Sequence, residues 1–149
     1  MLVVDLNLLL YATNRDSKDH DAARVWLESV LSGDEAVGFA WQVVLGYLRI
    51  TTHPRILPKP LSLEQSTTVI DGWLAQPAAR LLHPSERHWR ILKGLLEPVG
   101  TAGNLTSDAH LAALAIEHGA TLCSSDRDFA RFAHLKWSNP LDSGRGGQR

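Results

Sequence analysis

Short apolar runs alternate with longer segments of helical periodicity along most of the chain, and this alternation constrains the fold more than any other sequence feature. The runs that predict strands lie at residues 2–4, 36–39, 79–82, 121–123 and 135–137. Strands that alternate with helices form a mostly parallel sheet that is covered on both faces. We therefore expect an α/β fold, an α/β/α sandwich around a central sheet of about five short strands.

The segments between these runs have apolar residues at helical spacing. Predicted helices run from about residue 7, from 17 or 19 to 31, and over 43–51, 63–74, 85–96 and 106–118. Ser85 is the expected N-cap of the helix that it opens. Gly119 follows the last predicted helix, in the position that glycine often takes after a helix end. Residues 53–60 contain three prolines and therefore predict a loop.

Chain length and cysteine content favour one domain without covalent cross-links. A chain of 149 residues typically buries about 70% of the surface that it exposes when unfolded. We assign residues 1–141 to this domain and expect the polar segment 142–149 to be disordered. Cys123 is the only cysteine, which excludes an intrachain disulfide and a cysteine-based zinc site. A single cysteine fits a reducing compartment, so we expect a cytoplasmic protein, and no uncharged apolar stretch reaches the roughly 18 residues typical of a membrane span.

The overall charge gives no sign of a nucleic-acid binder, although one segment is basic. The formal net charge is −1, so the chain lacks a global positive footprint. No acidic residue occurs between Glu35 and Glu64, whereas that interval contains Arg49, His53, Arg55 and Lys59. Two interpretations have equal weight: a loop that happens to be basic, and a surface that faces phosphate.

Three aspartates are placed where this fold usually binds its ligands. Asp5 directly follows the first predicted strand, and Asp126 follows the strand at 121–123. In open α/β sheets, ligands bind outside the carboxyl ends of the strands. Asp108 lies in the first turn of its helix, on the same face as Leu111 and Ala112. Each residue also has a simpler interpretation, as a helix cap, a helix-end acid or a turn residue.

Convergence of these carboxylates would require a cation. Like charges at one site repel each other, and their burial is costly unless a positive charge neutralises them. Mg²⁺, or Mn²⁺ in its place, suits such a site because it needs only one or two carboxylates together with substrate phosphate. A bound metal can activate water for attack on phosphorus. Asp128 is either a further metal ligand, or a group that orients water, or the cap of the following helix.

The sequence resembles the PIN-domain family, and specifically toxins of the VapC type. The resemblance rests on three segments that together span nearly the whole chain: VVDLNLLLYA, WQVVLGYLRITTHP and GNLTSDAHLAALAIEHGATLCSSDRDF. The family's motif positions are occupied here by Asp5, Asn7, Asp108, Asp126 and Asp128. The resemblance implies a PIN-like fold, Mg²⁺-dependent endonucleolytic cleavage of RNA, inhibition by a small VapB-type antitoxin, and a homodimer.

One position departs from the family pattern. Many members have a glutamate on the central helix, and the matching residue here is Gly46. Glycine inside a helix costs roughly 1 kcal/mol relative to alanine, so we expect a close approach of backbone or substrate at this point. Arg49 lies three residues further along, and we hypothesise that it projects toward the site. The simpler interpretation is that Arg49 pairs with a surface acid. Arg49, Asn7 and Ser125 are the candidate contacts to RNA phosphate or to antitoxin.

Two other functions are compatible with the same residues. Loss of the acid at Gly46 is compatible with a catalytically weak or inactive PIN-fold module that only binds RNA or antitoxin; it would show no metal-dependent cleavage. Phosphoryl transfer through a covalent Asp5 is the third possibility. That chemistry usually requires a second acid two residues after the nucleophile, where this chain has Asn7. It therefore ranks last.

Overall fold

The computed structural model describes residues 1–142, and within them a five-stranded sheet forms the centre of the molecule. All neighbouring strands pair in parallel, in the order β3-β2-β1-β4-β5. The strands are β1 (Leu2–Val4), β2 (Val37–Ala40), β3 (Ala79–Leu82), β4 (Thr121–Cys123) and β5 (Lys136–Ser138). The predicted α/β/α fold is confirmed. Of the predicted disordered tail, residues 143–149 lie outside the described part of the chain.

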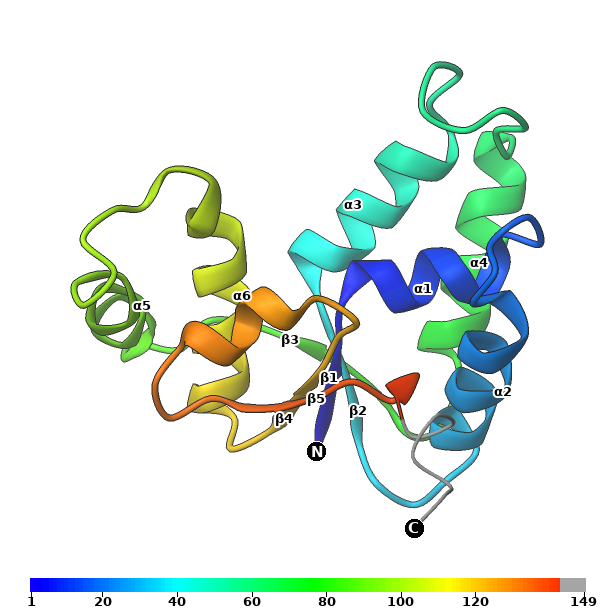
Figure 1. Cartoon of the computed structure of the whole chain (residues 1–149). Helices are drawn as coiled ribbons and strands as arrows, with labels where there is room; N and C mark the ends of the chain where they lie inside the picture. Colours follow the sequence, from blue (N-terminus) through cyan, green and yellow to red (C-terminus); the bar gives the residue numbers. More distant parts are fainter. Residues whose placement is uncertain (143–149) are drawn as a thin grey trace, which may run out of the picture.

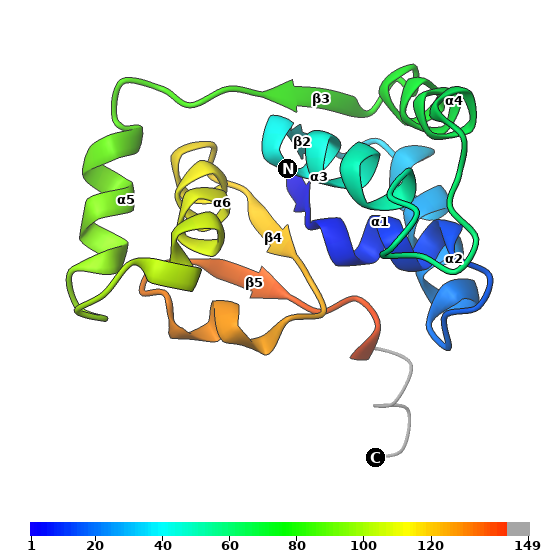
Figure 2. The ribbon, with the colours of Figure 1, turned by 90° about the horizontal axis from the view of Figure 1, so that it is seen from above.

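Helices cover both faces of the sheet (Figure 1). One side carries α1 (Leu6–Thr13), α2 (His20–Leu31), α3 (Trp41–Thr51) and α4 (Leu63–Leu74). The other side carries α5 (His88–Leu96) and α6 (Thr106–Glu117), as the view from above shows (Figure 2). Two short 3-10 helices, η1 (Gly103–Leu105) and η2 (Arg127–Arg131), flank α6 and β4 in the sequence. None of the helices in residues 1–142 has the length and hydrophobicity needed to cross a bilayer.

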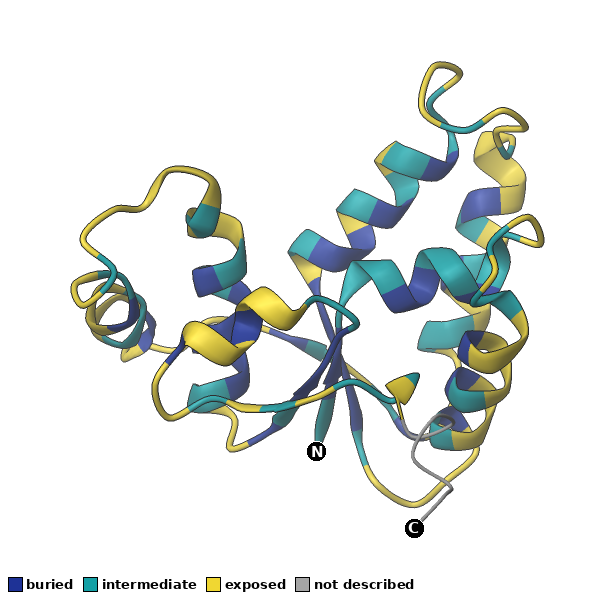
Figure 3. Ribbon diagram, in the orientation of Figure 1, coloured by how far each residue is buried: buried dark blue, intermediate teal, exposed yellow. Residues whose placement is uncertain are grey.

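The core lies along the central strands. Val3, Val4, Phe39 and Leu122 are fully buried, because the central strands are covered by helices on both faces, whereas the edge strands β3 and β5 are partly exposed (Figure 3). The apolar runs of β1, β2 and β4 are therefore what doubly covered parallel strands require. Leucine and alanine side chains from α1 and α6 complete this core.

The predicted start of the fifth helix is wrong. Helix α5 begins at His88, with no side-chain hydrogen bond at its N-terminus. The Ser85 hydroxyl instead donates to Glu117 Oε2 on α6 at 2.8 Å, and the Ser85 backbone N–H donates to Glu117 Oε1 at 3.2 Å. His88 Nδ1 also lies 3.3 Å from Glu117 Oε1. Ser85 therefore helps to fix the segment before α5 onto α6, a tertiary role that capping preferences do not predict.

Candidate functional site

Two of the predicted aspartates leave neighbouring strands at the same edge of the sheet. Asp5 follows β1 and Asp126 follows β4 by three residues, and these strands pair with Val4 opposite Cys123. Asp5 is also the N-cap of α1, because its Oδ1 accepts a 2.7 Å hydrogen bond from the Leu6 N–H. Asp5 therefore caps α1 and also lies at the edge of the sheet where it was predicted as a site residue.

Ser124 connects the residues at this edge. Its side chain is buried, and its Oγ donates to Asp5 Oδ2 at 2.6 Å. The same oxygen accepts from Asn7 Nδ2 at 3.2 Å and from the Asp126 N–H at 3.0 Å. One hydroxyl thus fixes the orientation of three site residues. Ser124 was not among the predicted site residues, whereas its neighbour Ser125, which is half-buried, was one of them.

Asp108 lies in the first turn of α6, and it approaches the same edge of the sheet from the face that α6 covers. Burial raises the pKa of the Asp108 carboxyl, and the negative charges of Asp126, Asp5 and Asp128 raise it further. Burial also raises the pKa of Asp5, partly offset by the Ser124 and Leu6 hydrogen bonds, and the charge of Asp126 adds to the rise. The carboxylates are therefore close enough to repel one another.

The acids do not, however, form a compact set of ligands. Within residues 1–142, no three Asp, Glu, His or Cys side chains converge closely enough to surround one ion. Asn7 Oδ1 is buried and has no hydrogen-bond partner. A buried oxygen without a partner costs about 1–3 kcal/mol, and Mg²⁺ keeps several waters and needs only one or two carboxylates. The unpaired oxygen and the mutually repelling carboxylates fit a hydrated divalent cation.

The two acids after β4 have different structural partners. Asp126 Oδ1 accepts from the Asp128 N–H at 2.9 Å, which makes Asp126 the cap of η2. Asp128 pairs with Arg131 at 3.2 Å, and both side chains are exposed. The capping role considered for Asp128 therefore belongs to Asp126. Arg131, which the sequence analysis did not select, is the cation whose charge lowers the pKa of Asp108.

One face of α3 is directed toward these acids. Gln42, Gly46 and Arg49 share this face because they are spaced at i, i+4 and i+7. Gln42 Nε2 donates to the backbone oxygen of Ser107, next to Asp108, at 3.4 Å. A Cβ atom at Gly46 would lie 2.8 Å from Leu6 Cδ2, next to Asp5. The close approach expected at Gly46 is thus that of the Leu6 side chain.

Arg49 lies on the same face and is exposed. It forms no ion pair with any residue in the described part of the chain. The simpler interpretation, in which Arg49 pairs with a surface acid, therefore has no support here. Its guanidinium is available to a negatively charged ligand.

Comparisons with known proteins agree with this fold. The family model described as the PIN domain matches residues 2–135. Ribonuclease VapC37 of Mycobacterium tuberculosis is 46% identical over 140 residues, which cover 94% of this chain and 97% of the relative. Ribonuclease VapC43 of the same organism is 43% identical over 142 residues, 95% of this chain and 97% of the relative. The solved structure of VapBC2 from Rickettsia felis, bound to a promoter DNA fragment, has a TM-score of 0.69 at 20% identity, with 93% of this chain and 97% of that chain covered.

Proposed function

Because this chain belongs to the PIN-domain family, and within it to the VapC type, we propose that it is a Mg²⁺-dependent endoribonuclease that acts as the toxin of a toxin–antitoxin pair. The observation that carries the proposal is that Asp5 and Asp126 leave neighbouring strands at one edge of the sheet, where the Ser124 hydroxyl contacts both residues. Asp126 raises the pKa of both other carboxyls, in addition to the effect of burial. Acids that repel one another beside an unpaired amide oxygen favour a divalent cation.

The metal would be held by Asp5, Asp108 and Asp126, directly or through water, with Asp128 as a further candidate. When bound, Mg²⁺ or Mn²⁺ supplies an activated water and neutralises charge on the leaving oxygen. Ser124 and the Leu6 N–H hold the Asp5 carboxylate in one orientation. Asn7 Nδ2 donates to the same Ser124 hydroxyl, and the buried Asn7 Oδ1 has no hydrogen-bond partner. These contacts set the ligand geometry before substrate arrives, which is how preorganised sites reduce the barrier.

Arg49 is the proposed phosphate-binding group. An arginine guanidinium binds phosphate through paired N–H donors, and Arg49 has no ion-pair partner among residues 1–142. Its face of α3 also carries Gln42, which reaches the backbone beside Asp108. A phosphate bound there would lie between α3 and the carboxylates. Asn7 and Ser125 remain candidate contacts to RNA or antitoxin.

Cleavage of total cellular RNA tests the proposal. The wild-type protein is compared with Asp5→Ala and with Asp34→Ala, which removes an exposed acid from the loop before β2. We expect cleavage by wild type and Asp34→Ala in Mg²⁺ or Mn²⁺, and none by Asp5→Ala or in the presence of a chelator. Cleavage by Asp5→Ala, or by wild type with chelator, would refute the metal site. No cleavage by any variant would favour the inactive RNA-binding or antitoxin-binding module.

A toxin of this kind requires a partner that inhibits it. The VapBC2 structure contains both components of such a pair, and a VapB-type antitoxin is the proposed partner of this chain. Basic groups such as Arg49 would bind antitoxin carboxylates as readily as phosphate.

The proposed homodimer is consistent with exposed apolar side chains on α3, where Trp41 is 46% and Leu45 is 56% exposed. Symmetric dimers are the commonest oligomers. Sedimentation of the purified protein tests this assembly.

A further inference from the structure

Two helices lead from the acidic edge to a groove at the far end of the molecule. Helix α1 begins after Asp5 and α3 begins at the end of β2, so both start at the carboxyl edge of the sheet. Their 8 and 11 residues extend about 12 and 16 Å at 1.5 Å per residue. Beyond their ends lies a groove of about 760 Å³, between the α1–α2 connection, the end of α3 and the loop at 52–61.

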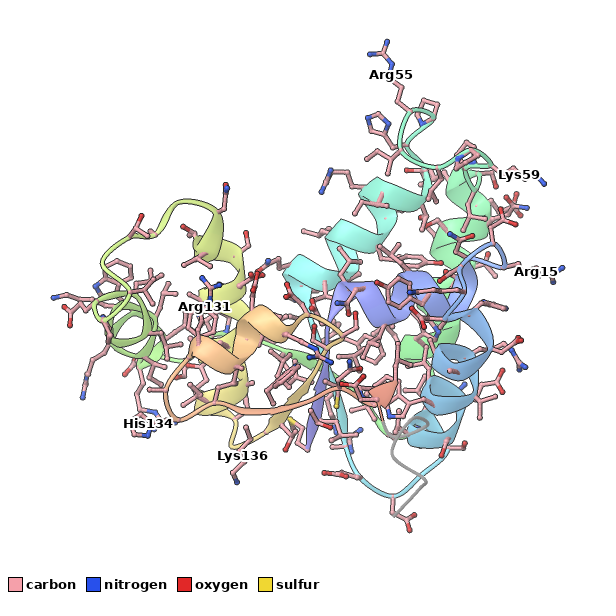
Figure 4. All side chains as sticks on the ribbon, in the orientation of Figure 1. Arg15, Arg55, Lys59, Arg131, His134 and Lys136 are labelled. Atoms are coloured by element: carbon pink, nitrogen blue, oxygen red, sulfur yellow. The ribbon has the colours of Figure 1, made fainter. Side chains whose placement is uncertain are left out.

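The groove has a basic rim. Arg15 and Lys59 line it from two different loops, and Arg55 lies one residue before Ile56, which also lines it. All three cations are exposed, and none forms an ion pair with residues 1–142. Asp16 is the single carboxylate among the lining residues. Figure 4 shows the three cations at one end of the molecule, on the opposite side from Lys136.

The floor of the groove is apolar. It includes Leu10 and Tyr11 from α1, Ile50 from α3, and Ile56 from the loop. Nucleobases have flat faces that stack on aromatic and aliphatic side chains, while basic groups follow the phosphate backbone. A positive rim above such a floor suits a single nucleic-acid strand. The acid-free interval from residue 36 to residue 63 supplies two of these cations, Arg55 and Lys59, in an otherwise acidic chain.

We infer that this groove is a second RNA-binding site, which holds phosphates outside the acidic edge through Arg15, Arg55 and Lys59. The choice of RNA as the ligand rests on the proposed function. Arg49 precedes Ile50 in the sequence and lies on α3 between the acidic edge and the groove. Arg49 and the three groove cations therefore provide positive charge from the proposed cleavage site to the groove. Stacked nucleotides advance about 3.4 Å each, so about five nucleotides span the helices.

The experiment measures RNA affinity as a function of salt, in a chelator, so that cleavage does not interfere. The test variant is Arg15→Gln/Arg55→Gln/Lys59→Gln, and its matched control is Arg90→Gln/Lys93→Gln/Lys136→Gln. The control removes the same charge from exposed positions on α5 and β5. A third variant, Arg15→Lys/Arg55→Lys/Lys59→Arg, keeps the charge. Fluorescence anisotropy measures the binding of a long single-stranded RNA, several times the length of the roughly five nucleotides that span the helices.

For the long RNA, we expect the test variant to bind at least tenfold more weakly at low salt. Each phosphate contact to a single strand contributes about 0.7 to the slope of log affinity against log salt, so three contacts reduce the slope by about 2. The matched control and the charge-keeping variant should behave as wild type. An unchanged slope for the long RNA would overturn the inference and leave the groove to a protein segment. The assay measures RNA binding in the absence of cleavage. A protein that binds RNA without cleaving it would therefore still show the smaller slope in the test variant.

Discussion

Ser124 Oγ donates a 2.6 Å hydrogen bond to Asp5 Oδ2, which joins the ends of two neighbouring strands across 119 residues of sequence. The same buried oxygen accepts from Asn7 and from the backbone of Asp126. All of its hydrogen-bonding capacity is therefore used to orient one carboxylate and the two groups beside it. Ser124 is a positioning residue, because it acts on the site through Asp5, Asn7 and Asp126.

Ser124→Ala should lower both stability and cleavage. The substitution leaves the buried Asp5 oxygen and the Asn7 amide without a partner, a cost of about 1–3 kcal/mol. We expect a lower urea midpoint and a lower kcat, with less change in RNA affinity, because only the Leu6 N–H then holds the Asp5 carboxylate. Ser138→Ala is the matched control, since Ser138 is an exposed serine on the neighbouring strand β5, outside this network. Equal effects of the two substitutions would contradict the positioning role of Ser124.

In the absence of metal, the raised pKa of Asp5 should make the protein less stable as pH rises. Burial favours the protonated carboxyl in the folded state and raises its pKa above the unfolded value of 3.8. A raised pKa gives stability that is present below the unfolded value and is lost as pH rises through the folded value. Asp108 has the same sign. Asp5→Asn should remove its part of this loss, because an amide does not ionise. Its single oxygen replaces only one of the two carboxylate oxygens that accept from Leu6 and Ser124, so the variant loses one hydrogen bond, at a similar cost at every pH.

Urea unfolding in a chelator, from about pH 4 to about pH 8, measures this effect. The stability of wild type should fall relative to that of Asp5→Asn as pH rises, whereas Asp34→Asn, at an exposed position, should run parallel to wild type. Addition of Mn²⁺ should restore the stability of wild type at the higher pH. Parallel curves for wild type and Asp5→Asn would show that burial does not perturb this carboxyl.

The periodicity of the sequence predicted the strands and most helices because local residues determine them. β3 and α4 have the predicted bounds, and Asp5 lies where a strand end and the topology rule placed it. Ser124 and Glu117 were missed for the opposite reason. Their partners, Asp5 and Ser85, are distant in sequence, and nothing local distinguishes Ser124 from Ser125. The contact of Gly46 with Leu6 was likewise beyond the sequence, because it depends on how α1 packs against α3.

Arg49→Gln should weaken RNA binding and cleavage together without affecting the fold. The side chain is exposed and has no ion pair among the described residues, so the change in unfolding free energy should stay within about 0.5 kcal/mol. Arg49→Lys should retain part of the affinity, since an ammonium keeps the charge but loses the paired donors. Anisotropy measures RNA affinity, and single-turnover cleavage measures the rate. Unchanged affinity and rate in Arg49→Gln would remove the phosphate role.

Gly46→Glu should increase metal affinity if the missing family acid faces the site. A Cβ atom at this position meets the end of the Leu6 side chain at 2.8 Å, so Leu6 must shift whichever residue is introduced. Gly46→Gln requires the same shift and gains the same helix propensity, up to about 1 kcal/mol. The difference between the two variants therefore isolates the added carboxylate.

Calorimetric titration with Mn²⁺, with and without a nonhydrolysable RNA, measures that difference. In wild type we expect weak binding alone and tighter binding with RNA, because phosphate oxygens supply the ligands that the reduced set of acids lacks. Gly46→Glu should bind Mn²⁺ more tightly than Gly46→Gln in the absence of RNA, and its dependence on RNA should be smaller. Equal affinity of the two variants would mean that position 46 does not face the metal. Equal affinity of wild type with and without RNA would refute the idea that substrate completes the site.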